Sequence, residues 1–88
     1  MERYLTKVDG WDHSAHRRIA RSFRFPDFVG ALEFANRVGD IAETEGHHPD
    51  LLVAWGRVEV TIWTHKVDGL TESDFILAAK IDQLAATG

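Results

Sequence analysis

Residues 51–65 read Leu-Leu-Val-Ala-Trp-Gly-Arg-Val-Glu-Val-Thr-Ile-Trp-Thr-His, and this stretch decides the fold class. Apolar and polar residues alternate from Val58 to His65, which is the period-two pattern of a strand with one buried face. Gly56-Arg57 separates this segment from the short apolar run 51–55, so the two segments are predicted to form a hairpin. The side chains predicted to face the core are Val58, Val60 and Ile62; those predicted to face the other way are Glu59, Thr61, Trp63 and His65.

Helices are predicted on both sides of this hairpin. Before it, apolar residues recur at intervals of three and four, the stripe of an amphipathic helix: Phe28, Ala31, Leu32, Ala35, Val38, Ile41 and Ala42. Pro26-Asp27 predicts the start of this helix and Gly46 its end. After the hairpin, Thr71-Glu72-Ser73-Asp74 predicts the capped start of a second helix, with Asp74 as the capping-box acid.

The remaining segment, residues 11–25, holds two candidate strands. The second runs from Ile19 to Phe25, and Arg21 interrupts its alternation. The element order is therefore strand, strand, helix, strand, strand, helix. This order predicts one α+β domain over residues 1–88, with a four-stranded antiparallel sheet made of two hairpins and both helices packed on one face.

The size and net charge of the chain exclude some classes of function. The chain has 88 residues and a formal net charge of −4, which argues against the basic surface that a nucleic-acid partner requires. The short basic cluster, Arg17-Arg18 with Arg21 and Arg24, is interpreted as a solvated strand face. No segment approaches the roughly 20 apolar residues that span a bilayer, and no signal peptide is recognised, so we expect a cytoplasmic protein. The small core and the absence of cysteine favour self-association.

Three of the five histidines lie in one region, as the adjacent pair His47 and His48 followed by His65. Imidazole is the side chain best suited to proton transfer near neutral pH, and helix and strand ends usually present functional groups. Glu43 precedes His47 by four residues, so we expect its carboxylate to orient or charge that ring. A histidine taken alone is more often structural, and His13 and His16 receive that interpretation.

Less specific interpretations of the same residues remain open. Asp74 fits the role of a helix cap, and Glu43 that of an ordinary helix carboxylate. Trp11 and Trp55 fit core or edge packing. A zinc site is disfavoured because adjacent side chains diverge, and no nucleophile motif or Gly-rich phosphate loop is present in the sequence.

The combined spacing closely resembles the signature of the pterin-4a-carbinolamine dehydratases: Glu43-x-x-x-His47-His48-Pro49, then Trp55, His65 and Asp74. The resemblance extends to Gly10-Trp11 and to Thr64-His65, and it covers nearly everything from Gly10 to Leu84. It implies an antiparallel four-stranded sheet with helices on one face, assembled as a homodimer or homotetramer. It also implies that no metal or organic cofactor is needed.

The reaction implied by the resemblance is that of a hydro-lyase, 4a-hydroxytetrahydrobiopterin dehydratase. It removes water from the 4a-carbinolamine, 4a-hydroxytetrahydropterin, and gives quinonoid dihydropterin. This recycles the cofactor of aromatic amino acid hydroxylases, so such a hydroxylase is a possible partner in the same pathway. The residues suit the chemistry, since one acid must protonate the leaving oxygen and one base must accept the proton from N5.

By the same resemblance, His47, His48 and His65 surround the pterin. We predict that His47 and His65 are the acid–base pair and that His48 positions the 4a-hydroxyl. Glu43 and Asp74 would orient these rings.

The resemblance also assigns Trp11 to the substrate as an apolar wall. Trp63 departs from the family, and its bulk predicts a contact to ligand or partner subunit. The chain departs from the family in that nine residues precede Gly10, so the usual N-terminal helix is expected to be shortened or absent. Gly46 stands where some relatives carry Asp, and Trp63 where a small residue is common.

Two other functions compete with the enzyme. One is a non-catalytic module for dimerisation, assembly or transcriptional coactivation, and the other is a protein that binds a pterin without converting it. The first does not need three histidines together with Glu43 and Asp74, and fold analogy alone is uninformative on this point. The second is separated from the enzyme by pH dependence, since catalysis should follow imidazole protonation between roughly pH 5 and 8, whereas simple binding need not be lost outside that range. The sequence therefore favours the dehydratase.

Overall fold

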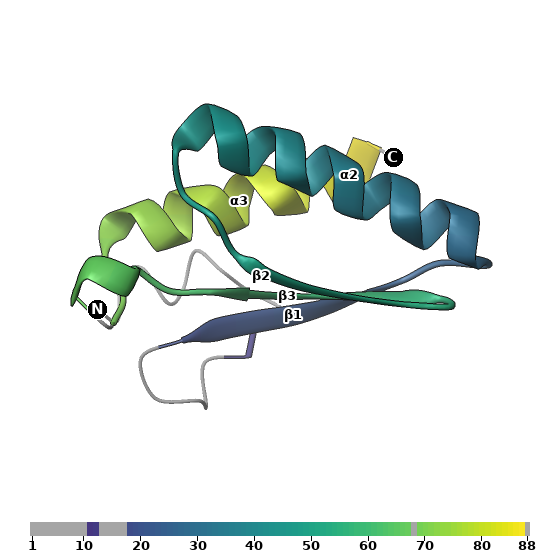
Figure 1. Ribbon diagram of the computed structural model, residues 1–88, viewed down its shortest axis with the longest axis horizontal. Helices are drawn as coiled ribbons and strands as arrows, with labels where there is room; N and C mark the ends of the chain where they lie inside the picture. The colour runs from purple at the N-terminus through teal and green to yellow at the C-terminus, as the bar shows by residue number, and fades with distance from the viewer. Residues whose placement is uncertain (1–10, 13–17, 68, 88) are drawn as a thin grey trace.

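The computed structural model describes residues 11–12, 18–67 and 69–87. Its elements are β1 (Ile19–Arg24), α2 (Phe28–Glu45), β2 (Asp50–Ala54), β3 (Arg57–Ile62), the 3-10 turn η1 (His65–Val67) and α3 (Glu72–Thr87). The strands form one antiparallel sheet in the order β1-β3-β2. Both helices lie on the same face of this sheet (Figure 1), so the predicted α+β class is confirmed.

The predicted fourth strand is represented by a single bridge. Asp12 pairs with Ala20 through two backbone hydrogen bonds of 2.6 and 2.9 Å, on the edge of β1 that faces away from β3. Residues 13–17 lie outside the described part of the structure, as do residues 1–10, so the expectation of a shortened or absent N-terminal helix stays a prediction. Within the described residues the sheet has three strands rather than four, and the complete fourth strand stays a prediction.

Local signals define both ends of α2. The carboxylate of Asp27, the N-cap residue, accepts a first-turn N–H at 2.8 Å, which is the expected capping contact. At the other end Gly46 adopts the left-handed conformation with φ of 65°. The N–H groups of Gly46 and His47 return to the carbonyls of Glu43 and Ala42 at 3.3 and 3.0 Å, the Schellman pattern. The predicted boundaries of this helix are therefore confirmed.

The core lies between the sheet and the two helices. The alternating residues Val58, Val60 and Ile62 of β3 are fully buried, as the sequence predicts. The same core cluster contains large side chains from β1, α2 and α3, among them Ile19, Phe23, Phe34, Val38, Phe75, Leu77 and Ile81. Each buried side chain of this size contributes about 1.5–3 kcal/mol, so this layer holds the helices on the sheet.

The predicted apolar stripe of α2 is partly wrong. Phe28 and Leu32, which it includes, are each 44% exposed. Phe34, which it omits, is buried with its ring centroid 4.8 Å from that of Phe23. The buried face of α2 consists of Ala31, Phe34, Ala35, Val38 and Ala42.

β2 and β3 form the predicted hairpin, but its turn is Trp55-Gly56 rather than Gly56-Arg57. The carbonyl of Gly56 accepts the N–H of Phe25 at 2.9 Å, and a Cβ on Gly56 would lie 2.9 Å from the carbonyl oxygen of Phe25. This close approach of two backbones explains the glycine. Trp55, which the sequence assigned to core or edge packing, is 70% exposed at this turn.

Gly39 and Gly46 give stability predictions of opposite sign. Gly39 lies inside α2, and a Cβ added there meets no atom within 4 Å. Gly39→Ala is expected to raise the free energy of unfolding by about 0.5–1 kcal/mol through lower chain entropy in the unfolded state. Gly46→Ala is expected to lower it by about 1 kcal/mol, because an L side chain is strained at this positive φ. Urea titration followed by circular dichroism measures both, and a shift of the same sign for both would contradict the assignment.

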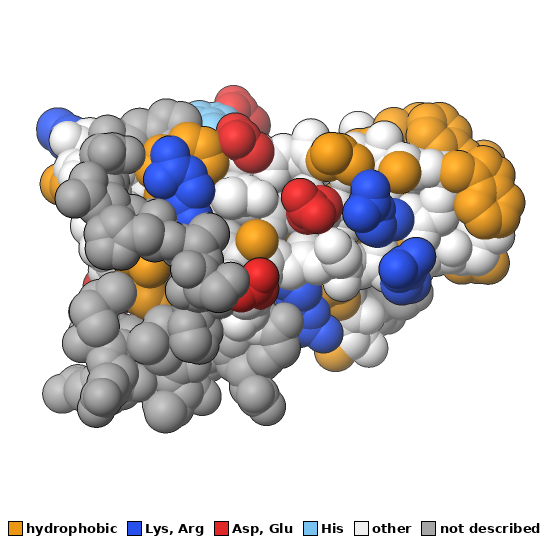
Figure 2. Space-filling view, turned by 90° about the horizontal axis from the view of Figure 1, so that it is seen from below, with side chains coloured by type: hydrophobic (Ala, Val, Ile, Leu, Met, Phe, Trp, Pro, Cys, Tyr) orange, Lys and Arg blue, Asp and Glu red, His pale blue; other side chains and the backbone are white. Residues whose placement is uncertain are grey.

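Neither α2 nor α3 covers the opposite face of the sheet. Figure 2 views this face and shows Lys and Arg side chains interspersed with Asp and Glu. Hydrophobic side chains gather at the end where the β2–β3 hairpin turns. Arg21 was predicted to lie on this solvated face, and that prediction is wrong. Its Nη1 donates to Asp82 of α3 at 2.7 Å, on the face of the sheet that the helices cover.

Candidate functional site

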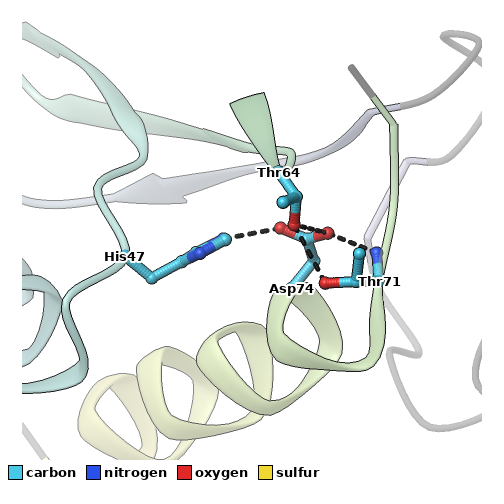
Figure 3. Close-up of polar contacts among 4 residues, drawn as sticks. All are labelled: His47, Thr64, Thr71 and Asp74. Carbon is cyan, nitrogen blue, oxygen red and sulfur yellow. Dashed lines mark hydrogen bonds and ion pairs between the residues drawn. The ribbon is translucent and has the colours of Figure 1, made fainter. Parts of the chain in front are cut away.

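His47 is the first candidate residue that the fold places firmly. It follows the left-handed turn at Gly46, and its N–H bonds to Ala42 at 3.0 Å, so its backbone is tied to the end of α2. The ring then extends toward the first turn of α3 (Figure 3). Its Nε2 lies 2.6 Å from Oδ1 of Asp74, and its side chain is 16% exposed.

Asp74 is the centre of this contact and is completely buried. Its Oδ2 accepts the backbone N–H of Thr71 at 2.6 Å, which confirms the predicted capping role at the start of α3. The same oxygen accepts the hydroxyl of Thr64 at 2.8 Å, and the hydroxyls of Thr64 and Thr71 lie 2.9 Å apart (Figure 3). The cap and the histidine contact thus use the two oxygens of one carboxylate.

The directions of these hydrogen bonds follow from the chemistry of the groups. A carboxylate only accepts, so His47 donates from Nε2 and Thr64 donates its single hydroxyl proton to Asp74. Thr64 Oγ1 must then accept from the hydroxyl of Thr71. With a proton fixed on Nε2, the neutral ring of His47 carries its lone pair on Nδ1.

The predicted contact between Glu43 and His47 is not formed. The carboxylate of Glu43 forms a hydrogen bond with Nε2 of His48 instead. The expected contact at a spacing of four requires a continuing helix, and the left-handed Gly46 ends the helix and turns His47 away. Both side chains of the observed pair are well exposed, 77% for Glu43 and 62% for His48, so this pair contributes little to stability.

A pocket of ≈ 300 Å³ lies beside His47. Its walls come from the end of α2 and the end of β3: Gly46, His47, His48, Trp63 and Thr64. The structure therefore brings together the two adjacent histidines and Trp63, which the sequence placed at the substrate. The structure adds Thr64 to this set, a residue whose hydroxyl gives no signal in the sequence beyond its place in the Thr64-His65 motif.

His65 is placed differently from the prediction. β3 ends at Ile62, and His65 begins the turn η1, so strand alternation does not decide where its ring points. The turn is held at its base by the pairing of Thr64 with Gly69, with backbone hydrogen bonds of 2.7 and 3.3 Å. The side chain of His65 lies outside the described part of the structure, and its convergence with His47 stays a prediction.

Trp11 is not brought to the pocket. It is buried in the core at 4% exposure, edge-on to Phe23 with ring centroids 6.2 Å apart. Its Nε1 donates to both carboxylate oxygens of Asp82 at 2.9 Å. Its position matches the core-packing interpretation, and it is not among the described residues that line the pocket beside His47, so its role as a wall against the substrate stays a prediction.

Trp63 lines the pocket and carries the guanidinium of Arg18 over its ring, 4.2 Å from the ring centroid. A cation stacked on indole in this way is attracted by the negative face of the ring. The stacking fixes Trp63 at the wall of the pocket. Its bulk therefore contributes to the shape of the pocket.

A larger hollow of ≈ 430 Å³ lies at the other end of α2, and its lining includes Phe23, Phe25 and Phe34 together with Arg24 and Arg37. It contains none of the predicted site residues. The candidate site is therefore placed at the smaller pocket, where the residues for proton transfer gather. Among the described residues, no three His, Cys, Asp or Glu side chains are placed to hold a metal ion. None of the described helices is long and apolar enough to cross a bilayer.

Comparison with known proteins gives a consistent family. Residues 1–84 match the family described as pterin 4 alpha carbinolamine dehydratase. A protein of Rubrobacter xylanophilus assigned by name to the pterin-4-alpha-carbinolamine dehydratases is 52% identical over 84 residues, 96% of this chain and 78% of that protein. The Arabidopsis thaliana protein named pterin-4-alpha-carbinolamine dehydratase 2, mitochondrial, is 55% identical over 91% of this chain and 45% of its own length.

Two solved structures share the fold. A transcriptional coactivator/pterin dehydratase from Brucella melitensis has a TM-score of 0.88 and 38% identity, covering 97% of this chain and 92% of that one. A pterin dehydratase-like protein described as a RuBisCO assembly factor in the alpha-carboxysome has a TM-score of 0.74 at 20% identity, over 90% and 93% of the two chains, which shows the fold alone. From the family match and the relatives together, the chain belongs to the pterin-4a-carbinolamine dehydratase family.

Proposed function

We propose that this protein dehydrates 4a-hydroxytetrahydropterin to quinonoid dihydropterin and water by histidine acid–base catalysis. One observation carries the proposal: the ring of His47 is hydrogen-bonded to the buried carboxylate of Asp74, and His47 lines a pocket together with His48. A histidine oriented by a carboxylate is a recurrent arrangement for proton transfer. Membership of the family supports the pterin as substrate class.

The proposed reaction asks for two proton transfers. The C4a–O bond breaks and an acid protonates the departing oxygen, so that water leaves. A base removes the proton from N5, and the electron pair of the N5–H bond forms the N5=C4a double bond. No electrons are gained or lost overall, so acids and bases supply all of the chemistry, each typically contributing about 10²–10⁴-fold.

His47 and His65 are proposed as the acid–base pair, with His48 positioning the 4a-hydroxyl. Because Nε2 of His47 is bonded to Asp74, its Nδ1 is the atom that exchanges a proton with the substrate. Asp74 is completely buried and acts through His47 rather than by touching the pterin. Trp63 is proposed as a wall against the pterin.

The wider setting is also part of the proposal. We infer that the product feeds tetrahydropterin recycling, with an aromatic amino acid hydroxylase as the enzyme that consumes the recovered cofactor. A homodimer or homotetramer is supported by exposed apolar side chains on α2, namely Phe28, Val29 and Leu32. A cytoplasmic location stays a prediction, and the Arabidopsis relative carries a mitochondrial name.

The direct test is a dehydration assay with freshly generated 4a-hydroxytetrahydropterin, comparing the protein with the spontaneous background. We expect clear acceleration by the wild-type protein. His65→Ala is expected to lower kcat by about 100-fold, as for loss of one acid–base group. Lys66→Ala, which changes the exposed neighbouring residue on the same turn, is the control expected to keep kcat. No acceleration by the wild type would favour the non-catalytic alternative, an assembly or coactivator-like module, over the enzyme.

A further inference from the structure

We propose that the side-chain hydroxyl of Thr64 is a positioning group that couples the two histidine-bearing segments of the site. The inference rests on the proposed function, since His47 and His65 are there the reacting pair. Thr64 is linked to both segments, to His47 through its side chain and the carboxylate of Asp74 and to the turn that bears His65 through its backbone. It acts through Asp74 and is not itself proposed to exchange a proton with the pterin.

The side-chain link runs to His47. Thr64 Oγ1 donates to Oδ2 of Asp74 at 2.8 Å, and Oδ1 of the same carboxylate accepts from Nε2 of His47 at 2.6 Å. Oδ2 also accepts the N–H of Thr71 at 2.6 Å. Two donors on Oδ2 prevent rotation of the carboxylate about its Cβ–Cγ bond, so Oδ1 stays aimed at His47 (Figure 3).

The backbone link runs to the turn that bears His65. The N–H of Thr64 donates to Gly69 at 2.7 Å, and its carbonyl accepts from Gly69 at 3.3 Å and from Val67 at 3.2 Å. These bonds close the loop that starts at His65. A single residue therefore joins this loop to the carboxylate that orients His47.

The hydrogen bonds from Thr71 through Thr64 to Asp74 all run in one donor-to-acceptor direction. The link therefore requires a hydroxyl group at residue 64. Thr71 donates to Thr64 Oγ1 across 2.9 Å, and Thr64 donates onward to Asp74. A methyl group in place of the Thr64 hydroxyl can neither donate to Oδ2 nor accept from Thr71. The carboxylate then keeps only the Thr71 N–H on Oδ2, and its hold on the His47 ring weakens.

The test compares Thr64→Val, which keeps the shape of the side chain, with Thr64→Ser, which keeps the hydroxyl. We expect Thr64→Val to lower kcat by about 10- to 100-fold with little change in KM, because misplacing a catalytic group costs mainly turnover. Thr64→Ser is expected to restore most of kcat. Thr61→Val makes the same chemical change on β3 away from the site and is expected to keep kcat. Thermal unfolding of each variant shows whether it is folded under the assay conditions.

A second measurement separates positioning from general damage to the fold. The ring nitrogens of His47 are read by ¹⁵N NMR of the substrate-free protein. Wild type and Thr64→Ser are expected to show the tautomer with the proton on Nε2, and Thr64→Val a mixture of both tautomers. Unchanged kcat in Thr64→Val, or a fall in kcat with unchanged His47 tautomers, overturns the coupling through Asp74. If the wild type fails to accelerate dehydration, the proposed function fails, while the NMR comparison still decides whether Thr64 orients His47.

Discussion

Asp74→Asn is expected to lower kcat for carbinolamine dehydration by about 10²–10³-fold and to lower the free energy of unfolding by about 3 kcal/mol. The carboxylate is completely buried and accepts from His47, Thr64 and the N–H of Thr71. An asparagine at this position has one acceptor oxygen and an NH₂ group that only donates. One of the two sides of the network must therefore face the NH₂ group and lose its acceptor.

The effect on activity depends on which way the asparagine amide is oriented between His47 and the cap of α3. If the amide oxygen keeps the capping position at Thr71, the NH₂ group faces His47 and donates to Nε2. The proton of the neutral ring then moves to Nδ1, the atom proposed to accept a proton from the substrate. If the amide is reversed, the cap of α3 loses its acceptor, and the half-buried N–H of Thr71 is left without its partner on residue 74.

Steady-state kinetics and urea unfolding measure the two effects of Asp74→Asn. Asp40→Asn is the matched control, because Asp40 is an exposed aspartate on α2, and neither quantity should change. A variant that keeps wild-type kcat while His47 still carries its proton on Nε2 would remove Asp74 from the mechanism.

His47→Gln is expected to lower kcat by about 10²–10⁴-fold while the protein stays folded. The glutamine NH₂ group can donate to Asp74 as the imidazole does, so the buried carboxylate keeps a partner. The amide cannot accept and return a proton near neutral pH. Activity should therefore fall through chemistry rather than through unfolding.

Two further variants sharpen this comparison. His47→Ala leaves Oδ1 of Asp74 without its partner and is expected to cost about 1–3 kcal/mol of stability in addition to the activity. His48→Gln changes a ring that is paired with Glu43 at the surface, so we expect a smaller fall in kcat, about 10-fold, and little change in stability. An equal loss of kcat in His47→Gln and His48→Gln would contradict the division of roles between the two histidines.

The motif residues were found in the sequence, but their pairing was not. Glu43 was assigned to His47 by helical spacing, and the structure pairs it with His48 because Gly46 breaks the helix between them. Spacing rules apply only within one continuous element. At the residue where a helix ends, a change of one backbone dihedral redirects every side chain that follows.

The alternation rule met a similar limit after β3. It correctly placed Val58, Val60 and Ile62 in the core, but it does not extend to His65, because Thr64 pairs with Gly69 and leads the chain into a 3-10 turn. Trp11 shows the same kind of limit. Its indole N–H reaches Asp82 across 71 residues of sequence, a partner that no local pattern predicts.

The sequence by itself determined the helix boundaries at Asp27 and Gly46, the hairpin and its buried face, and the acid that caps α3. Those features depend on residues a few positions apart, whose conformational preferences act before any tertiary contact forms. Only the tertiary structure decided that one carboxylate, Asp74, serves both the helix cap and the ring of His47, with Thr64 between them. These three residues come from separate segments, and their contact depends on how α2, β3 and α3 pack around one core.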